Sequence, residues 1–188
     1  TRKIRKNQIS LLLLDWEKAF DKIDQEGLFE AMDRMNIDPK LIRLTRQLYK
    51  NPEFYVEMDA QSSGWKKQTT GIRQGCTLSP YLFLIVMTVI FADVHADPEL
   101  AEELRKHRPP EMEFDEVLYA DDTIVFSTDA LTIEKLLHKI EQCAEPYGLT
   151  LNDKKCETIC TDPSYSYKIR TRRHKVICRR KEAKYLER

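Results

Sequence analysis

The sequence predicts an α+β domain in which helices cover an antiparallel sheet. Three observations predict this fold. Leu11–Leu14 is a short apolar run typical of a buried strand. Residues 114–119 and 123–126 are two further apolar runs, rich in Val, Ile, Tyr and Phe, and the short gap between them predicts a β-hairpin. Between and after these strands, apolar residues recur at helical spacing, most clearly over residues 131–147. The chain of 188 residues has the length of one ordinary domain.

The first half of the chain predicts two helices and a second hairpin. Apolar residues are spaced for a helix over residues 26–35. Asp38-Pro39 is a typical helix start, with Asp as the cap and Pro in the first turn. Residues 54–60 alternate as a strand does, residues 62–64 predict a turn, and residues 65–70 predict the returning strand.

The second half predicts three helices and a final strand. Ser79-Pro80 and Asp97-Pro98 each start a helix. The amphipathic helix over residues 131–147 ends at Gly148. Residues 149–160 then form a strand that enters from a turn at Asn152-Asp153.

Composition describes a globular chain, with 41% hydrophobic and 33% charged residues. No apolar run has the length of a membrane span, and the basic N-terminus lacks the apolar stretch of a signal peptide. Because the chain does not begin with Met, we expect it to be a piece of a longer protein. The five cysteines are odd in number and unevenly spaced, which favours a reducing intracellular compartment.

The net charge is zero, but the charges are unevenly distributed. Residues 168–181 contain eight Lys or Arg and no acid, whereas residues 97–116 contain eight acids and three Lys or Arg. Two interpretations of the basic segment stay open. It can grip a phosphate backbone locally, or it can be a solvated and partly flexible tail.

Acidic residues stand at the ends of two predicted strands. Asp121 and Asp122 form the tip of the predicted hairpin, and Asp15 ends the apolar run 106 residues earlier (121 − 15). Adjacent or buried carboxylates are costly for folding, whereas a hard divalent cation such as Mg²⁺ prefers their oxygens. The pattern therefore predicts a shared metal site at the edge of one sheet, as two-metal phosphoryl transfer requires. An exposed polar turn is the alternative for the hairpin alone.

Four blocks in order resemble reverse transcriptases, and most closely those of non-LTR (LINE-type) retrotransposons. Residues 13–21 (LLDWEKAFD) are similar to the family's motif A, and residues 71–83 (GIRQGCTLSPYLF) to motif B. Residues 119–122 (YADD) are similar to motif C, and residues 147–155 (YGLTLNDKK) to motif D. A shorter fifth block, Lys184-Tyr185-Leu186, is similar to the start of the primer-grip motif, although Glu187 stands where the family usually has Gly.

The resemblance implies roles for particular residues. Asp15, Asp121 and Asp122, with the backbone carbonyl of Trp16, would hold two Mg²⁺ ions, for which Mn²⁺ is a substitute. Lys155 would donate a proton to the leaving pyrophosphate, or alternatively be a solvent-facing lysine. Cys156 follows it where the family often has Thr.

The resemblance also implies a nucleotide site. Phe20 would lie under the incoming sugar and exclude a 2′-hydroxyl, or alternatively belong to the core. Gln74 and Gly75 would contact the nascent base pair. Arg73 would pair with a phosphate, or alternatively be an exposed surface residue. Tyr185 and Leu186 would belong to the primer grip.

The predicted function is RNA-directed DNA synthesis from a primer 3′ end on an RNA template, using deoxynucleoside triphosphates. We expect residues 1–188 to form a polymerase palm with part of the fingers, inside a larger retroelement polyprotein, without the N-terminal fingers segments or the thumb. The family implies nuclear residence and no membrane partner. The alternatives are a non-catalytic remnant that keeps the fold or binds nucleic acid, an RNA-templated RNA polymerase, and a zinc site at Cys156, Cys160, His174 and Cys178.

Overall fold

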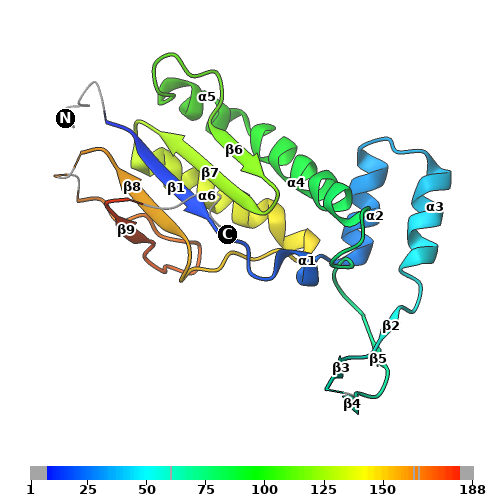
Figure 1. Ribbon diagram of the computed structural model, residues 1–188. Helices are drawn as coiled ribbons and strands as arrows, with labels where there is room; N and C mark the ends of the chain where they lie inside the picture. The colour runs from blue at the N-terminus through cyan, green and yellow to red at the C-terminus, as the bar shows by residue number, and fades with distance from the viewer. Residues whose placement is uncertain (1–7, 60, 163, 165, 183–188) are drawn as a thin grey trace. The chain divides into compact units, whose positions relative to one another are not determined.

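The structure is a computed structural model that describes residues 8–59, 61–162, 164 and 166–182. It divides into two compact units. The sheet unit comprises residues 1–17, 90–145 and 150–188, and the helical unit comprises residues 18–89 and 146–149. Figure 1 shows the course of the chain through both units.

The sheet unit is built on a five-stranded sheet with the order β6-β7-β1-β8-β9. Strand β1 (Ser10–Leu14) lies at its centre and pairs antiparallel with β7 (Asp122–Ser127) and β8 (Glu157–Cys160). Strand β6 (Glu116–Tyr119) pairs antiparallel with β7, whereas β9 (Cys178–Arg180) pairs parallel with β8. The predicted α+β fold with a helix-covered sheet is confirmed, but the sheet is antiparallel only over its first four strands.

One face of this sheet is buried under helix α6 (Ala130–Ala144), which contacts β7 and β1. Alternation along the strands sends Leu12, Leu14 and Val125 to this face, where they are 0–3% exposed. On α6 the facing residues are fully buried at helical spacing: Ile133, Leu136, Leu137 and Ile140. The other face stays more open, with Val117 39% and Tyr119 63% exposed.

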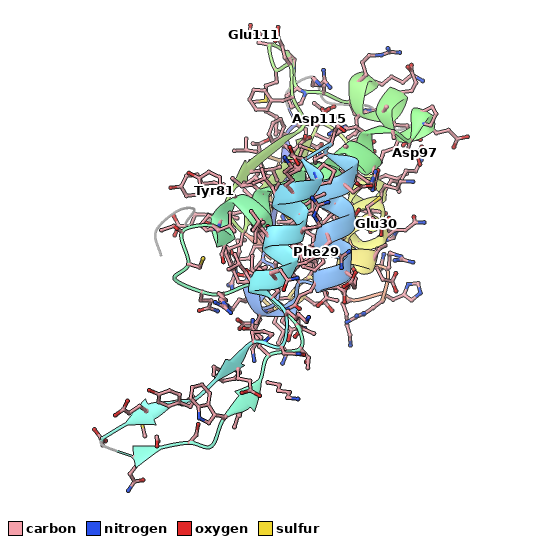
Figure 2. The ribbon with its side chains drawn as sticks, turned by 90° about the vertical axis from the view of Figure 1, so that its right-hand side faces the viewer. Phe29, Glu30, Tyr81, Asp97, Glu111 and Asp115 are labelled. Carbon is pink, nitrogen blue, oxygen red and sulfur yellow. The ribbon has the colours of Figure 1, made fainter. Side chains whose placement is uncertain are left out.

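Helix α5 (Pro98–Lys106) packs against α6, and the side chain of Asp97 caps it by accepting the N–H of Leu100 at 3.1 Å. Asp115 is 3% exposed and pairs with Arg108, whose Nη2 lies 2.6 Å from Oδ2. This bidentate pair fixes the chain just before β6. Asp115 and Asp97 are labelled in Figure 2.

The basic segment is not an unstructured tail over the residues described. Ile169, Thr171 and Ile177 are 1–2% exposed, and Arg170 bridges to Val176 in antiparallel fashion. The N–H of Ile177 donates to the carbonyl of Ile169 at 2.9 Å. Strand β9 then joins the sheet. The interpretation of residues 168–181 as a partly flexible tail is therefore wrong.

The helical unit begins with α1 (Ala19–Lys22), α2 (Gln25–Arg34) and α3 (Pro39–Leu48). Asp24 and Asp38 cap α2 and α3, as expected from Asp before a helix start. Figure 2 shows Phe29 and Glu30 on α2 beside α3, where the guanidinium of Arg46 lies 4.2 Å from the Phe29 ring centroid. Helix α4 (Ser79–His95) begins in this unit and ends in the sheet unit. The 3₁₀ turn η1 (Glu145–Tyr147) ends at Gly148, whose φ is 72°.

The second predicted hairpin is an arm of two short ladders, β2 (Glu53–Phe54) with β5 (Lys66–Lys67) and β3 (Glu57–Met58) with β4 (Gln61–Ser62). It extends away from α2 and α3 (Figure 2). The chain reverses between β3 and β4, so the turn predicted at residues 62–64 is wrong: Ser62 lies in a strand. Both strands of each ladder are exposed, so no buried face fixes their register.

Within the described residues, no single helix is long and apolar enough to cross a membrane. Helices α4 and α5 pass the length and hydropathy test only as a pair, and they are bent by 85°.

Candidate active site

Asp15 follows the last residue of β1, and its backbone is fixed by the turn that precedes β8. Its N–H lies 3.5 Å from the Sγ of Cys156, and its carbonyl accepts the N–H of Asn152 at 2.8 Å. The residue is 8% exposed. The carboxylate is therefore held at the strand end by backbone contacts that do not use its side chain.

The sheet register brings Asp122 next to Asp15. Leu14 pairs with Thr123, so Asp15 and Asp122 are the next positions along the two strands. Opposite residues of an antiparallel pair lie on the same face of a sheet, which here is the open face of Leu13 and Ile124. Asp122 thus lies within β7 rather than in the turn.

Ala120 and Asp121 form the two-residue loop between β6 and β7. Ala120 has a φ of 52°, the left-handed region that tight hairpin loops require and that costs a non-glycine residue about 1 kcal/mol or more. Asp121 is half-buried at the tip. The hairpin is confirmed with Asp121 at its tip, but the placement of Asp122 in the tip is wrong.

Lys155 contacts this group. Its Nζ lies 3.9 Å from the Oδ1 of Asp15, and its side chain is 58% exposed against 9% for that of Asp15. The structure therefore gathers Asp15, Asp122 and Lys155 at one end of the sheet, with Asp121 in the adjoining loop.

Trp16 is 3% exposed, and its indole Nε1 donates to the hydroxyl of Thr123 at 3.4 Å. Its backbone forms an isolated bridge with Leu151. The hydrogen bonds that close this bridge run from Glu17 and Asn152 to the carbonyls of Thr150 and Asp15. Neither hydrogen bond uses the carbonyl oxygen of Trp16. The bridge therefore does not occupy the atom that was predicted to bind a metal ion.

The three acids form a donor set that suits a hard divalent cation. Asp15, Asp121 and Asp122 offer the hard carboxylate oxygens that Mg²⁺ prefers, and register makes two of them neighbours. Among the residues described, however, no three His, Cys, Asp or Glu side chains form a group that could hold an ion. The three-carboxylate metal site therefore stays a prediction.

The same finding covers Cys156, Cys160, His174 and Cys178, all of which are described, so the structure does not support the zinc alternative. Cys156 instead packs against the backbone of Asp15, and burial raises the pKa of its thiol to about 11. Cys160 accepts a hydrogen bond from Ser10 at 3.5 Å.

In the helical unit, Phe20 is half-buried and stacks on Phe83 with ring centroids 5.0 Å apart. Its neighbour Asp21 accepts a hydrogen bond from the Nε2 of Gln74 at 2.8 Å. The N–H of Ile72 donates to the carbonyl of Phe20 at 2.7 Å. These contacts join the residues after Asp15 to the loop that starts α4.

Arg73 lies against the end of α3. Its Nη2 donates to the carbonyl of Leu48 at 2.9 Å, and its guanidinium lies 5.9 Å from the Tyr49 ring centroid. Gly75 has a φ of 81° and open space where a Cβ would stand. The nucleotide roles predicted for Phe20, Arg73, Gln74 and Gly75 remain predictions, and Tyr185 and Leu186 lie outside the described residues.

Two contacts of the site were not predicted. Cys156 supports Asp15, and the only signal in the sequence is its place beside Lys155, where the resembled family often has Thr. Asp21 positions Gln74 across 53 residues of chain, which no local pattern indicates.

Comparison with known proteins identifies the family. A sequence model of the family "Reverse transcriptase (RNA-dependent DNA polymerase)" matches residues 1–186. The chain is 25% identical over 166 residues to a Pol polyprotein from the type-1 retrotransposable element R2 of Nasonia vitripennis, covering 88% of this chain and 16% of that protein. It is 27% identical over 146 residues to an uncharacterized 149 kDa protein of transposon TX1 from Xenopus laevis, covering 74% of this chain and 10% of that protein.

The solved structure of apo telomerase from Candida tropicalis, truncated from its C-terminal domain, has a similar fold. Its TM-score is 0.65 at 17% identity, over 86% of this chain and 32% of that one. The likeness shows a polymerase palm fold. The chain belongs to the reverse transcriptase family, and its curated relatives are proteins of non-LTR retrotransposons. It spans about a sixth of the first relative's length and a tenth of the second's.

Proposed function

We propose that the chain carries the polymerase active centre of an RNA-directed DNA polymerase, which joins a deoxynucleotide to a primer 3′-hydroxyl on an RNA template. The observation that carries this proposal is the end of β1. There Asp15 is buried, stands next to Asp122 in register, and has Lys155 3.9 Å from its carboxylate. The end of a sheet gains no stability from two adjacent acids, so their placement favours a chemical role.

Asp15, Asp121, Asp122 and the carbonyl of Trp16 would hold the divalent cations, Mg²⁺ or Mn²⁺. When bound, these ions lower the pKa of the attacking hydroxyl and neutralise charge on the departing pyrophosphate. The chain supplies the positions. Cys156 and Asn152 fix the backbone of Asp15, and the hairpin loop fixes Asp121.

Lys155 supports the departure of pyrophosphate. Its side chain is more than half exposed, so it can reach a ligand as well as Asp15. In this role it donates a proton to the leaving phosphate oxygen.

Phe20 supports selection of deoxynucleotides. Its ring is held against Phe83, and a ring fixed by stacking can exclude a 2′-hydroxyl by bulk. Gln74, oriented by Asp21, and Gly75 would lie along the nascent base pair, with Arg73 near a phosphate.

The test is primer extension on an RNA template by the complete parent protein. We expect Asp121→Asn and Asp15→Asn each to lower the rate by at least about 100-fold, because a ligand to the reacting centre contributes several kcal/mol to the transition state. Asp33→Asn, an exposed acid on α2, is the control and keeps the parent rate. If Asp121→Asn extends primers at the parent rate, the assignment fails. If the parent protein binds RNA but never extends a primer, the non-catalytic alternative holds.

A further inference from the structure

Residues 168–175 present cations from a hairpin that is packed onto α6. Ile169, Thr171 and Ile177 are buried, whereas the alternate and tip residues point outward and are exposed. The exposed set is Lys168, Arg170, Arg172, Arg173, His174 and Lys175. We call residues 166–177 the basic hairpin.

Two glutamates of α6, and Glu145 directly after it, hold this hairpin mostly through its backbone. Glu134 accepts the N–H of Arg170 at 2.6 Å, and Glu141 accepts the N–H of Arg172 at 2.8 Å. Glu145 pairs with the guanidinium of Arg172 at 3.2 Å. Glu134 and Glu141 thus accept backbone N–H groups in these contacts. Of these three glutamates, only Glu145 pairs with a cationic side chain among the hairpin residues that the structure describes, that of Arg172.

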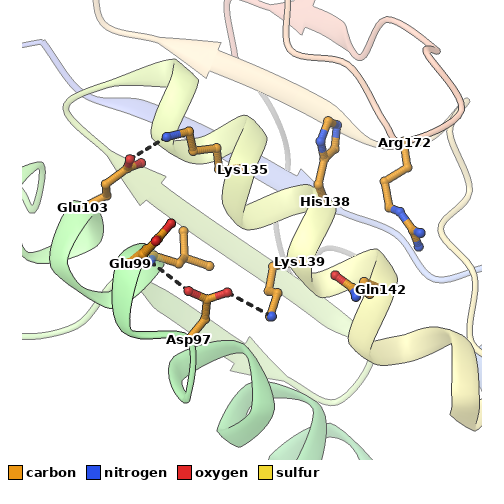
Figure 3. A pocket seen from close by; sticks show the side chains of 9 residues that line it. Asp97, Glu99, Glu103, Lys135, His138, Lys139, Gln142 and Arg172 are labelled. Atoms are coloured by element: carbon orange, nitrogen blue, oxygen red, sulfur yellow. Dashed lines mark hydrogen bonds and ion pairs between the residues drawn. The ribbon is translucent and has the colours of Figure 1, made fainter.

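Three of the exposed cations form no ion pair within the described residues. Lys168, Arg173 and Lys175 form no ion pair with any carboxylate in the part of the chain that the structure describes. In the neighbouring groove of about 380 Å³ between α5 and α6, by contrast, the lysines are paired with carboxylates. Lys135 pairs with Glu103, and Lys139 pairs with Asp97. Figure 3 shows these two pairs, with Arg172 and His138 at the other end of the groove.

The basic hairpin lies on the helix-covered side of the sheet. Its anchors Glu134 and Glu141 belong to α6, which covers the face of Leu12 and Val125. Asp15 and Asp122 belong to the opposite, open face. A ligand on the basic hairpin is therefore separated from the carboxylates by the sheet itself.

We propose that the basic hairpin binds the phosphate backbone of a nucleic-acid strand, at a surface distinct from the polymerase centre. Several unpaired cations on a rigid turn are suited to a row of phosphates, because binding then releases counterions without ordering the protein. A protein interface would need apolar anchors at its centre, and Val176 is the only apolar side chain largely exposed within residues 166–177.

The test is binding of a labelled single-stranded RNA to the 188-residue chain, measured by fluorescence anisotropy at several salt concentrations. Removing two phosphate contacts with Arg173→Ala/Lys175→Ala should raise the Kd about tenfold near 0.15 M salt. It should also reduce the slope of log K against log salt by about 1.4, since each single-strand contact contributes about 0.7. The control Arg105→Ala/Lys106→Ala removes two exposed cations that already pair with Glu102, and it should change both values much less.

Two further variants make the result specific. Arg173→Lys/Lys175→Arg keeps the charges and should bind as the parent does. The alanine pair is judged on RNA affinity alone and Asp121→Asn on primer extension alone, so that failure of the polymerase proposal is seen separately. The inference is overturned if the alanine pair matches its control in Kd and slope. It is also overturned if poly-glutamate competes as well as RNA at equal charge, which would indicate an acidic protein partner.

Discussion

Gly71 and Gly75 offer a matched pair of substitutions in the loop before α4. Both have a left-handed φ, 80° and 81°, which costs an alanine about 1–2 kcal/mol. They differ in the space around a new Cβ. At Gly71 it would lie 2.6–2.7 Å from three backbone atoms of Asp21, whereas at Gly75 nothing lies within 4 Å.

Gly71→Ala should therefore cost more than Gly75→Ala. Backbone atoms cannot rotate away, so Asp21 must move by about 0.7 Å to reach ordinary contact, and such overpacking costs about 1–3 kcal/mol. Any gain from a stiffer unfolded chain is the same for both variants and cancels. Urea denaturation followed by circular dichroism measures the difference, which we expect to be about 1–3 kcal/mol. Equal losses in the two variants would refute the close approach of residues 21 and 71.

Three other outcomes follow from the sheet unit. Glu116 raises the pKa of His95 above its usual 6.5, so the pair stabilises the fold below about pH 6.5 and this contribution is lost as pH rises through the folded pKa. His95→Gln should thus lower the free energy of unfolding more at pH 5.5 than at pH 8.5. We expect a difference of less than about 1 kcal/mol because the pair is partly exposed. Urea denaturation at the two pH values measures it, and a larger loss at pH 8.5 would contradict the sign. Burial raises the pKa of Cys156 from 9.0 to about 11, so iodoacetamide at pH 8 should label the exposed Cys178 at least about 100-fold faster, as mass spectrometry of the native protein would show. Similar labelling rates would mean that the end of β1 is open. Trp16→Phe should cost about 1 kcal/mol in thermal unfolding, because the Thr123 hydroxyl loses its buried donor; an unchanged melting temperature would show that this bond contributes nothing.

The sequence was informative where local chemistry decides the structure. An apolar run before Asp15 and two runs around Asp121 predict strands because all three are too short for helices, and the two around Asp121 are rich in Val, Ile, Tyr and Phe. Asp38 and Asp97 predict helix starts because their carboxylates accept the N–H groups that a helix leaves unpaired, and the structure shows both bonds.

Long-range partners were not predictable in this way. The parallel pairing of β9 with β8 depends on the burial of Ile169, Thr171 and Ile177, whose alternation is masked in the sequence by the cations between them. The turn of the arm lies between β3 and β4 and not at residues 62–64 as predicted. The residues of both strands are exposed, so no buried face indicates the register. At the site, the sequence indicated Asp15 and the acidic hairpin, but only the sheet register shows that Asp122 is the immediate neighbour of Asp15.

The central claim is that Asp15 and the acids of the β6–β7 hairpin share divalent cations. The most direct measurement is anomalous diffraction from crystals of the protein grown with Mn²⁺ and a deoxynucleoside triphosphate. We predict an anomalous peak at coordinating distance from carboxylate oxygens of both Asp15 and Asp121, which Asp15→Asn abolishes. Ordered Mn²⁺ that touches only one of these carboxylates, or neither, would contradict the account.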